Sequence, residues 1–92
     1  MTIFIDPPDW SGHGRMWSHM ISDTSYEELH AFAALLGIPT RAFERDHYDV
    51  AAERYRLALE AGAVPVTSRE IVALLHAAGL RRRKSARRPE GS

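Results

Sequence analysis

Three segments with helical periodicity each end in a glycine followed by an apolar residue, and short strand-like runs lie between them. The three endings are Gly37-Ile38, Gly62-Ala63 and Gly79-Leu80. Helices commonly end at a glycine, which takes the left-handed conformation without a steric penalty. Strands that alternate with helices favour an α/β fold class. The sequence therefore predicts a small single-domain α/β protein, a two-layer or three-layer sandwich with a short, mainly parallel sheet and about three helices.

Two of the helix starts carry the pattern of a capping box, in which a hydroxyl and a Glu three residues later bond each other's backbone N–H groups. Thr24 and Glu27 give this pattern before the first helix, and Thr67 and Glu70 give it before the third. The second helix is expected from about residue 51 to residue 61, with Asp49 as its N-cap.

The first two predicted strands carry candidate polar groups. Residues 2–5 form a β-branched and aromatic run that ends at Asp6, because the two following prolines disfavour a continued ladder. Residues 17–22 alternate in polarity, so Trp17 and His19 share one side of a strand. Asp6 is thus predicted at the end of a strand, and His19 within the next one.

The remaining segments are shorter. Residues 42–44 fit a short strand, and residues 63–66 fit an edge strand because Pro65 cannot donate to a ladder. Residues 9–16 are rich in glycine and polar groups and are expected to form a loop, as are residues 46–49.

The formal net charge of zero is the sum of two unlike parts. Residues 1–80 hold 6 basic and 11 acidic side chains, a net charge of −5, whereas residues 81–92 hold 6 basic side chains and one acidic. We therefore predict a compact domain over residues 1–80 and a disordered basic tail over residues 81–92. Such a tail can contact the phosphates of nucleic acid weakly, or it can simply aid solubility.

Several classes of protein and site are excluded or lose support. The chain has no cysteine, which excludes disulfides and Cys-ligated metal. It shows no secretion signal and no apolar run of about 18 residues, so we expect a cytoplasmic protein without a membrane partner. Phosphate-loop, dinucleotide-fold and serine-hydrolase motifs are also missing.

Polar side chains gather near the predicted strand ends, where ligands bind in α/β sheets. A histidine between two carboxylates, as in residues 46–49, suits a metal ligand or a general base. The predicted catalytic residues are His47, Asp49 and Asp6. The predicted ligands for a divalent metal such as Mg, Mn or Zn are His19, Asp23 and His47. The predicted ligand-binding side chains are Tyr48, Trp17 and Trp10.

Each of these residues also has a structural explanation. His47 can be an exposed loop residue, and His19 can be a core histidine that bonds a backbone carbonyl. Asp23 can complement the dipole of the first helix. Trp10 and Trp17 can be packing residues.

Two functional hypotheses follow. The first is a small hydrolase, with or without the assistance of a divalent metal, for a phosphate-containing or nucleotide-like ligand. The second is a non-catalytic binding or accessory module for an unknown small ligand, whose basic tail contacts nucleic acid. The two hypotheses can be distinguished by geometry. The hydrolase is favoured if His19, His47 and at least one of Asp6, Asp23 and Asp49 lie within coordination reach of one another.

Blocks of sequence resemble an uncharacterised family, the domain of unknown function 4031, which occurs in bacteria and their phages. The resemblance covers about residues 1–80. Its blocks are the strand that ends in Asp6, the run HMISDTSYEELHAFA over residues 19–33, LGI over 36–38, HYDV over 47–50 and AGA over 61–63. It implies a compact domain and no particular activity.

Overall fold

The computed structural model describes residues 1–82, and the predicted tail beyond Arg82 lies outside the described residues. These residues form strands β1 (Ile3–Ile5), β2 (Trp10–Gly12), β3 (Arg15–Ser22), β4 (Phe43–Glu44), β5 (His47–Ala51) and β6 (Val64–Pro65). The α-helices are α1 (Tyr26–Leu35), α2 (Tyr55–Glu60) and α3 (Ser68–Ala78), and the 3-10 helices are η1 (Thr40–Ala42) and η2 (Ala52–Arg54). The predicted α/β class with three helices is confirmed for this part of the chain.

The strand order is β4-β5-β3-β1-β6, and β2 pairs with the outer part of β3. Only β1 and β6 pair in parallel, while the other pairings are antiparallel. The prediction of a mainly parallel sheet is therefore wrong. The predicted edge strand at residues 63–66 is confirmed, because β6 pairs with β1 alone.

Two of the antiparallel pairings, β2 with β3 and β4 with β5, are hairpins. Residues 9–16, expected to be a loop, contain β2 and a two-residue turn into β3. His13 and Gly14 form this turn with φ values of 50° and 74°, which match the left-handed turns of tight hairpins. Residues 46–49 were also expected to be a loop, but β5 begins at His47 and pairs back on β4. Asp49 is therefore a strand residue and not the cap of α2.

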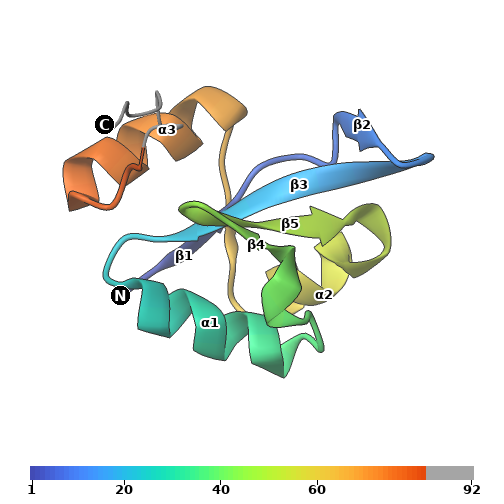
Figure 1. The fold of residues 1–92 in the computed structure, drawn as a ribbon, viewed down its shortest axis with the longest axis horizontal. Helices are drawn as coiled ribbons and strands as arrows, with labels where there is room; N and C mark the ends of the chain where they lie inside the picture. Colours follow the sequence, from blue (N-terminus) through green and yellow to red (C-terminus); the bar gives the residue numbers. More distant parts are fainter. Residues whose placement is uncertain (83–92) are drawn as a thin grey trace, which may run out of the picture.

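Helix α3 lies on one face of the sheet, and α1 and α2 lie on the other (Figure 1). The strands alternate between these layers. Met20, Tyr48 and Val50 are fully buried in the core cluster that includes residues of α1 and α2. Ile21 points to the opposite face and packs against Leu75 of α3. The architecture is a three-layer sandwich.

The helix starts partly follow the predicted caps. Thr67 and Glu70 form the capping box of α3, as the sequence predicted. Helix α1 is capped one residue later than expected, because Ser25, not Thr24, accepts from the N–H of Glu28 at 3.0 Å. None of the helices in residues 1–82 is long and apolar enough to cross a bilayer.

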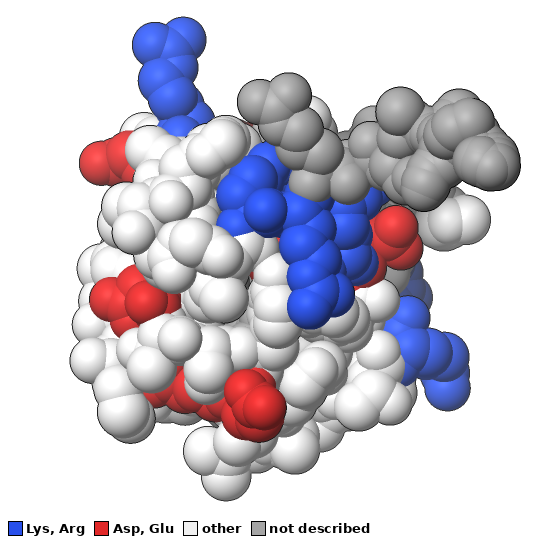
Figure 2. Space-filling model, turned by 60° about the vertical axis from the view of Figure 1, so that its left-hand side comes forward, with Lys and Arg blue, Asp and Glu red and all other residues white. Residues whose placement is uncertain are grey.

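The charged side chains are unevenly spread over the visible surface. Figure 2 shows Lys and Arg side chains gathered in one area, with Asp and Glu side chains apart from one another on the same face. Arg81 and Arg82, which the sequence assigned to the start of the tail, both contact Asp46 of the β4–β5 turn. The folded body therefore includes contacts made by these two residues.

Candidate functional site

The candidate site lies on the face of the sheet that carries α3, beside the part that α3 covers. On this face His19 of β3 is the direct cross-strand partner of Asp49 of β5. His47 lies two residues before Asp49, so the alternation of a strand places it on the same face. Three potential metal ligands are thus brought together by the pairing of two neighbouring strands.

Asp6 orients His19 through contacts with its ring and its backbone. Its side chain is fully buried, and Oδ2 lies 2.8 Å from His19 Nδ1 while Oδ1 accepts the backbone N–H of His19 at 2.6 Å. The hydroxyl of Ser68, the first residue of α3, donates to the same Oδ2 at 2.8 Å. This carboxylate therefore joins the end of β1, the middle of β3 and the start of α3.

The protonation of this pair follows from its contacts. Burial would raise the pKa of Asp6, but the hydrogen bonds from the side chain and backbone of His19 and from Ser68 outweigh burial and lower the pKa. An ionised Asp6 can only accept, so Nδ1 of His19 carries the proton. In this tautomer of the ring, Nε2 of His19 would be the nitrogen available to bind a metal.

Asp46 orients His47 in the same manner. Its side chain is fully buried, and its Oδ1 lies 2.9 Å from Nδ1 of His47. Oδ2 accepts the backbone N–H of Arg82 at 2.9 Å, and the guanidinium of Arg81 lies 3.4 Å away. A buried carboxylate thus holds His47 by the nitrogen that faces away from His19.

The other nitrogen of His47 faces Asp49. Nε2 lies 3.2 Å from Oδ1 of Asp49, whose side chain is 44% exposed. Burial would lower the pKa of His47, but its hydrogen bonds to Asp49 and Asp46 outweigh burial and raise the pKa. The imidazole therefore bridges two carboxylates, one buried and one exposed, and both favour its protonated form.

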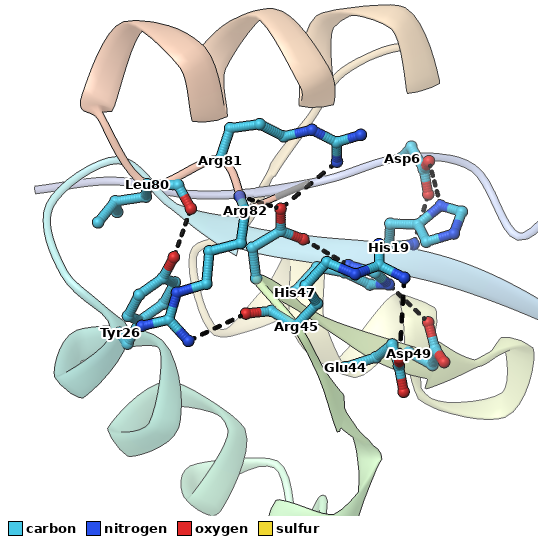
Figure 3. Close-up of polar contacts among 11 residues, drawn as sticks. Asp6, His19, Tyr26, Glu44, Arg45, His47, Asp49, Leu80, Arg81 and Arg82 are labelled. Atoms are coloured by element: carbon cyan, nitrogen blue, oxygen red, sulfur yellow. Dashed lines mark hydrogen bonds and ion pairs between the residues drawn. The ribbon is translucent and has the colours of Figure 1, made fainter. Parts of the chain in front are cut away.

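The three groups converge on one point. One ligand atom from each of His19, His47 and Asp49 lies within 4.8 Å of the other two, and the two imidazole rings are 5.0 Å apart at 74°. Figure 3 shows the three side chains close together, with Asp6 behind His19. Two ligands of a tetrahedral zinc ion lie about 3.3 Å apart, since each bond is about 2.0–2.1 Å. The spacing between His47 and Asp49 fits this value.

Two grooves meet at the convergent residues. The first has a volume of about 590 Å³, and its lining includes His19 and Asp49 together with Trp10 and Trp17. The second, of about 650 Å³, lies along α3 and includes His19, His47 and the apolar Ile71 and Val72. The three groups are therefore accessible to a ligand from two sides.

Four of the predicted catalytic and metal-binding residues lie together, and Asp23 lies apart from them. Asp6, His19, His47 and Asp49 form one connected group. Asp23 follows the C-terminal end of β3, where its Oδ1 accepts the backbone N–H of Thr2 at 2.9 Å. The bond with Thr2 is also the main cause of the lowered pKa of Asp23.

The predicted ligand-binding residues also divide. Tyr48 lies on the opposite face of the sheet, fully buried, with its hydroxyl 2.7 Å from Nδ1 of His30. Trp10 and Trp17 both line the first groove.

The sequence pointed to the carboxylates on either side of His47, which include Asp46, but it assigned no role to Ser68. Ser68 is recognisable only through its bond to Asp6, because it starts a helix far along the chain. Arg81 and Arg82 were hidden in a run of basic residues that is typical of a solvated tail.

A family model described as "Protein of unknown function (DUF4031)" matches residues 3–78, from β1 to the end of α3. The chain belongs to this family. The matched residues of the DUF4031 domain include Asp6, His19, Asp46, His47 and Asp49. Comparisons with curated proteins and with solved structures gave no match. A function for this DUF4031 domain must therefore be argued from the geometry of its site.

Proposed function

We propose that the protein is a metal-dependent hydrolase that acts on a phosphate-containing, nucleotide-like substrate. His19, His47 and Asp49 would hold one divalent ion. The observation that carries the proposal is that two buried carboxylates, Asp6 and Asp46, orient two histidines, and that one ligand atom of each histidine lies within 4.8 Å of a carboxylate oxygen of Asp49. Histidine ligands of metals commonly donate their other nitrogen to such a carboxylate.

The donor set favours zinc or manganese over magnesium. Two imidazole nitrogens and one carboxylate oxygen suit Zn²⁺, whereas Mg²⁺ prefers oxygen ligands and retains much of its water. The contact between His47 and Asp49 at 3.2 Å fits the same interpretation, because a metal ion can replace the proton between them.

Three protein ligands leave coordination positions for water and for a substrate oxygen, as in catalytic zinc sites. A bound divalent ion lowers the pKa of its water to about 7 and polarises a phosphoryl oxygen. The protein's own contribution is to fix the tautomer of His19 through Asp6 and to orient His47 through Asp46. Asp49, which is 44% exposed, faces the solvent from which a substrate would approach.

A thermal-unfolding screen with Zn²⁺, Mn²⁺, Mg²⁺ and EDTA tests the site. Specific binding at 100 times the dissociation constant should stabilise the protein by about 2.7 kcal/mol. Asp49→Asn should abolish the shift, whereas His76→Ala, an exposed histidine of α3, should retain it. Loss of the shift in both variants, or no shift in the wild type, would contradict a metal site at these residues.

The reaction is tested separately with the zinc-loaded and manganese-loaded protein on bis(4-nitrophenyl) phosphate. We expect release of nitrophenol that disappears in Asp49→Asn and persists in His76→Ala. Metal binding without hydrolysis of any phosphate ester would favour the non-catalytic module. The nucleic-acid contact of that alternative involves residues 81–92, of which residues 83–92 lie outside the described part of the chain, and it stays a prediction.

A further inference from the structure

The first groove combines flat aromatic rings with positive charge beside the candidate metal ligands. Its lining includes Trp10 and Trp17 of the β2–β3 hairpin, and His19 and Asp49 of the site. Its volume of about 590 Å³ falls within the range of pockets that bind one small molecule. The groove therefore has room for a ligand of the size of a single nucleotide.

Trp10 is exposed but fixed in place. The residue is 48% exposed, yet its indole N–H lies 3.2 Å from the hydroxyl of Ser68 and 3.3 Å from Oδ2 of Asp6. Its ring lies 5.0 Å from the ring of His19 at an interplanar angle of 70°. An exposed ring that is anchored at its polar edge presents an apolar face to a planar ligand without a large loss of side-chain entropy.

Trp17 extends the aromatic surface. It is the cross-strand partner of Trp10, so both indoles lie on the same face of the hairpin. Its own N–H donates to the carbonyl of Gly12 at 2.8 Å. Stacking on aromatic side chains accepts any nucleobase, because every base has a π-face.

The cations of the groove contrast with the acidic body. The lining contains Arg15, Arg41 and Arg54, and Asp49 is its one carboxylate residue. Arg15 lies 5.9 Å from the centre of the Trp17 ring, and Arg54 donates to the carbonyl of Leu36 at 2.9 Å. Both guanidinium groups are thus partly positioned. Guanidinium groups bind phosphate through paired, charge-assisted hydrogen bonds.

We propose that this groove binds a nucleoside monophosphate. The base stacks on Trp10 and Trp17, and the phosphate is bound by Arg41 and the neighbouring arginines. Binding of this ligand requires no metal. The further claim that the ligand is the substrate rests on the proposed function, because the groove opens on His19 and Asp49.

Intrinsic fluorescence tests the binding directly, because the two tryptophans of the chain both line the groove. The full-length protein is titrated in EDTA with adenosine monophosphate, and separately with adenosine and with ribose 5-phosphate. We expect saturable quenching by adenosine monophosphate, and affinities at least tenfold weaker for each half, because each lacks the phosphate or the base.

Two matched pairs of variants assign the contacts by calorimetry. Trp10→Leu should weaken binding of adenosine monophosphate at least tenfold, whereas Trp10→Phe, which loses the same N–H but keeps a flat ring, should retain most of it. Arg41→Ala should weaken binding about tenfold, whereas Arg56→Ala, an exposed arginine of α2 outside the groove, should leave it unchanged. Equal losses of affinity in Trp10→Leu and Trp10→Phe, or in Arg41→Ala and Arg56→Ala, would overturn the assignment.

The outcome of the nucleotide-binding experiments can be distinguished from that of the metal experiment. Zinc stabilisation without binding of adenosine monophosphate would overturn this inference and leave the proposed function intact. Nucleotide binding without a metal response would support the inference and contradict the hydrolase. Binding of a single-stranded oligonucleotide, but of no mononucleotide, would also overturn it.

Discussion

The backbone N–H of Arg82 donates to Oδ2 of Asp46 at 2.9 Å, although the two residues are 36 positions apart in the chain. The other oxygen of the same carboxylate orients His47. Around this bond, the guanidinium of Arg82 lies 4.2 Å from the centre of the Tyr26 ring, and the Tyr26 hydroxyl donates to the carbonyl of Leu80. The residues that follow α3 therefore bind Asp46, which in turn orients His47.

The first prediction compares two deletions of the C-terminus. Removal of residues 83–92 should leave zinc affinity unchanged, whereas removal of residues 81–92 should lower it 10-fold to 100-fold, the usual effect of a lost outer-shell partner. The reason is that Asp46 loses the N–H of Arg82 and the nearby guanidinium of Arg81. Competitive titration with a zinc chelator measures both affinities. Equal affinities for the two deletions would exclude a role for Arg81 and Arg82.

The second prediction concerns Asp6→Asn. The variant loses a buried charge that accepts bonds from His19 and Ser68, and we expect a loss of about 1–3 kcal/mol in the free energy of unfolding. Zinc affinity should also fall, because the tautomer of His19 is no longer fixed. Asp9→Asn, at an exposed position, is the matched control. Chemical denaturation and zinc titration should show no change for this control.

The third prediction is a pH dependence of the metal-free protein. The pKa of His47 is raised above its ordinary value of 6.5, because the bonds to Asp49 and Asp46 outweigh burial. A raised pKa contributes stability that is complete below 6.5 and is lost as the pH rises through the higher pKa of the folded protein. The ring of His19 and the guanidinium of Arg81, which bonds Asp46, also face this group.

Thermal unfolding in EDTA from pH 5.5 to pH 8.5 measures this contribution. The stability difference between wild type and His47→Gln should be largest at the acidic end and should shrink toward pH 8.5. A difference that grows with pH would mean that His47 is held neutral between its two carboxylates.

The fourth prediction separates the two faces of β5. Tyr48→Phe removes a buried hydroxyl that bonds His30, and should cost about 0.5–1.5 kcal/mol of stability. It should leave the affinities for zinc and adenosine monophosphate unchanged, because Tyr48 faces away from both grooves. Loss of either affinity, at an intact fold, would restore the ligand-binding role that the sequence suggested for this residue.

The fold class could be predicted from the sequence, and the direction of the strands could not. The helix-ending glycines and the capping box of Thr67 are local signals, and each is where the pattern places it. The hairpins were missed because glycine and polar residues stand in these segments where strands usually have β-branched and aromatic residues. Asp46 and His47 read as a polar loop, although Tyr48 and Val50 alternate with the polar residues in the pattern of a half-buried strand.

The site was predicted where strand ends and histidines coincide, and this found Asp6, His19, His47 and Asp49. Their meeting depends on the register of β3 against β5, which pairs His19 with Asp49 and is set by tertiary packing. Asp23 was included because it follows the end of a predicted strand in a sheet that was expected to be mainly parallel, whereas β1 and β3 are antiparallel. Four residues along an extended strand span about 13 Å, too far for ligands of one ion.

The side chains of β5 alternate between the core and the candidate site. Tyr48 and Val50 are fully buried, while His47 and Asp49, which alternate with them along the strand, face the grooves. Insertion or deletion of one residue in this strand would turn the ligands into the interior and bring the core side chains to the surface. Evolution can therefore vary this centre only by substitution in place, so a relative that lacks these side chains but keeps the strand should keep the fold and lack the proposed activity.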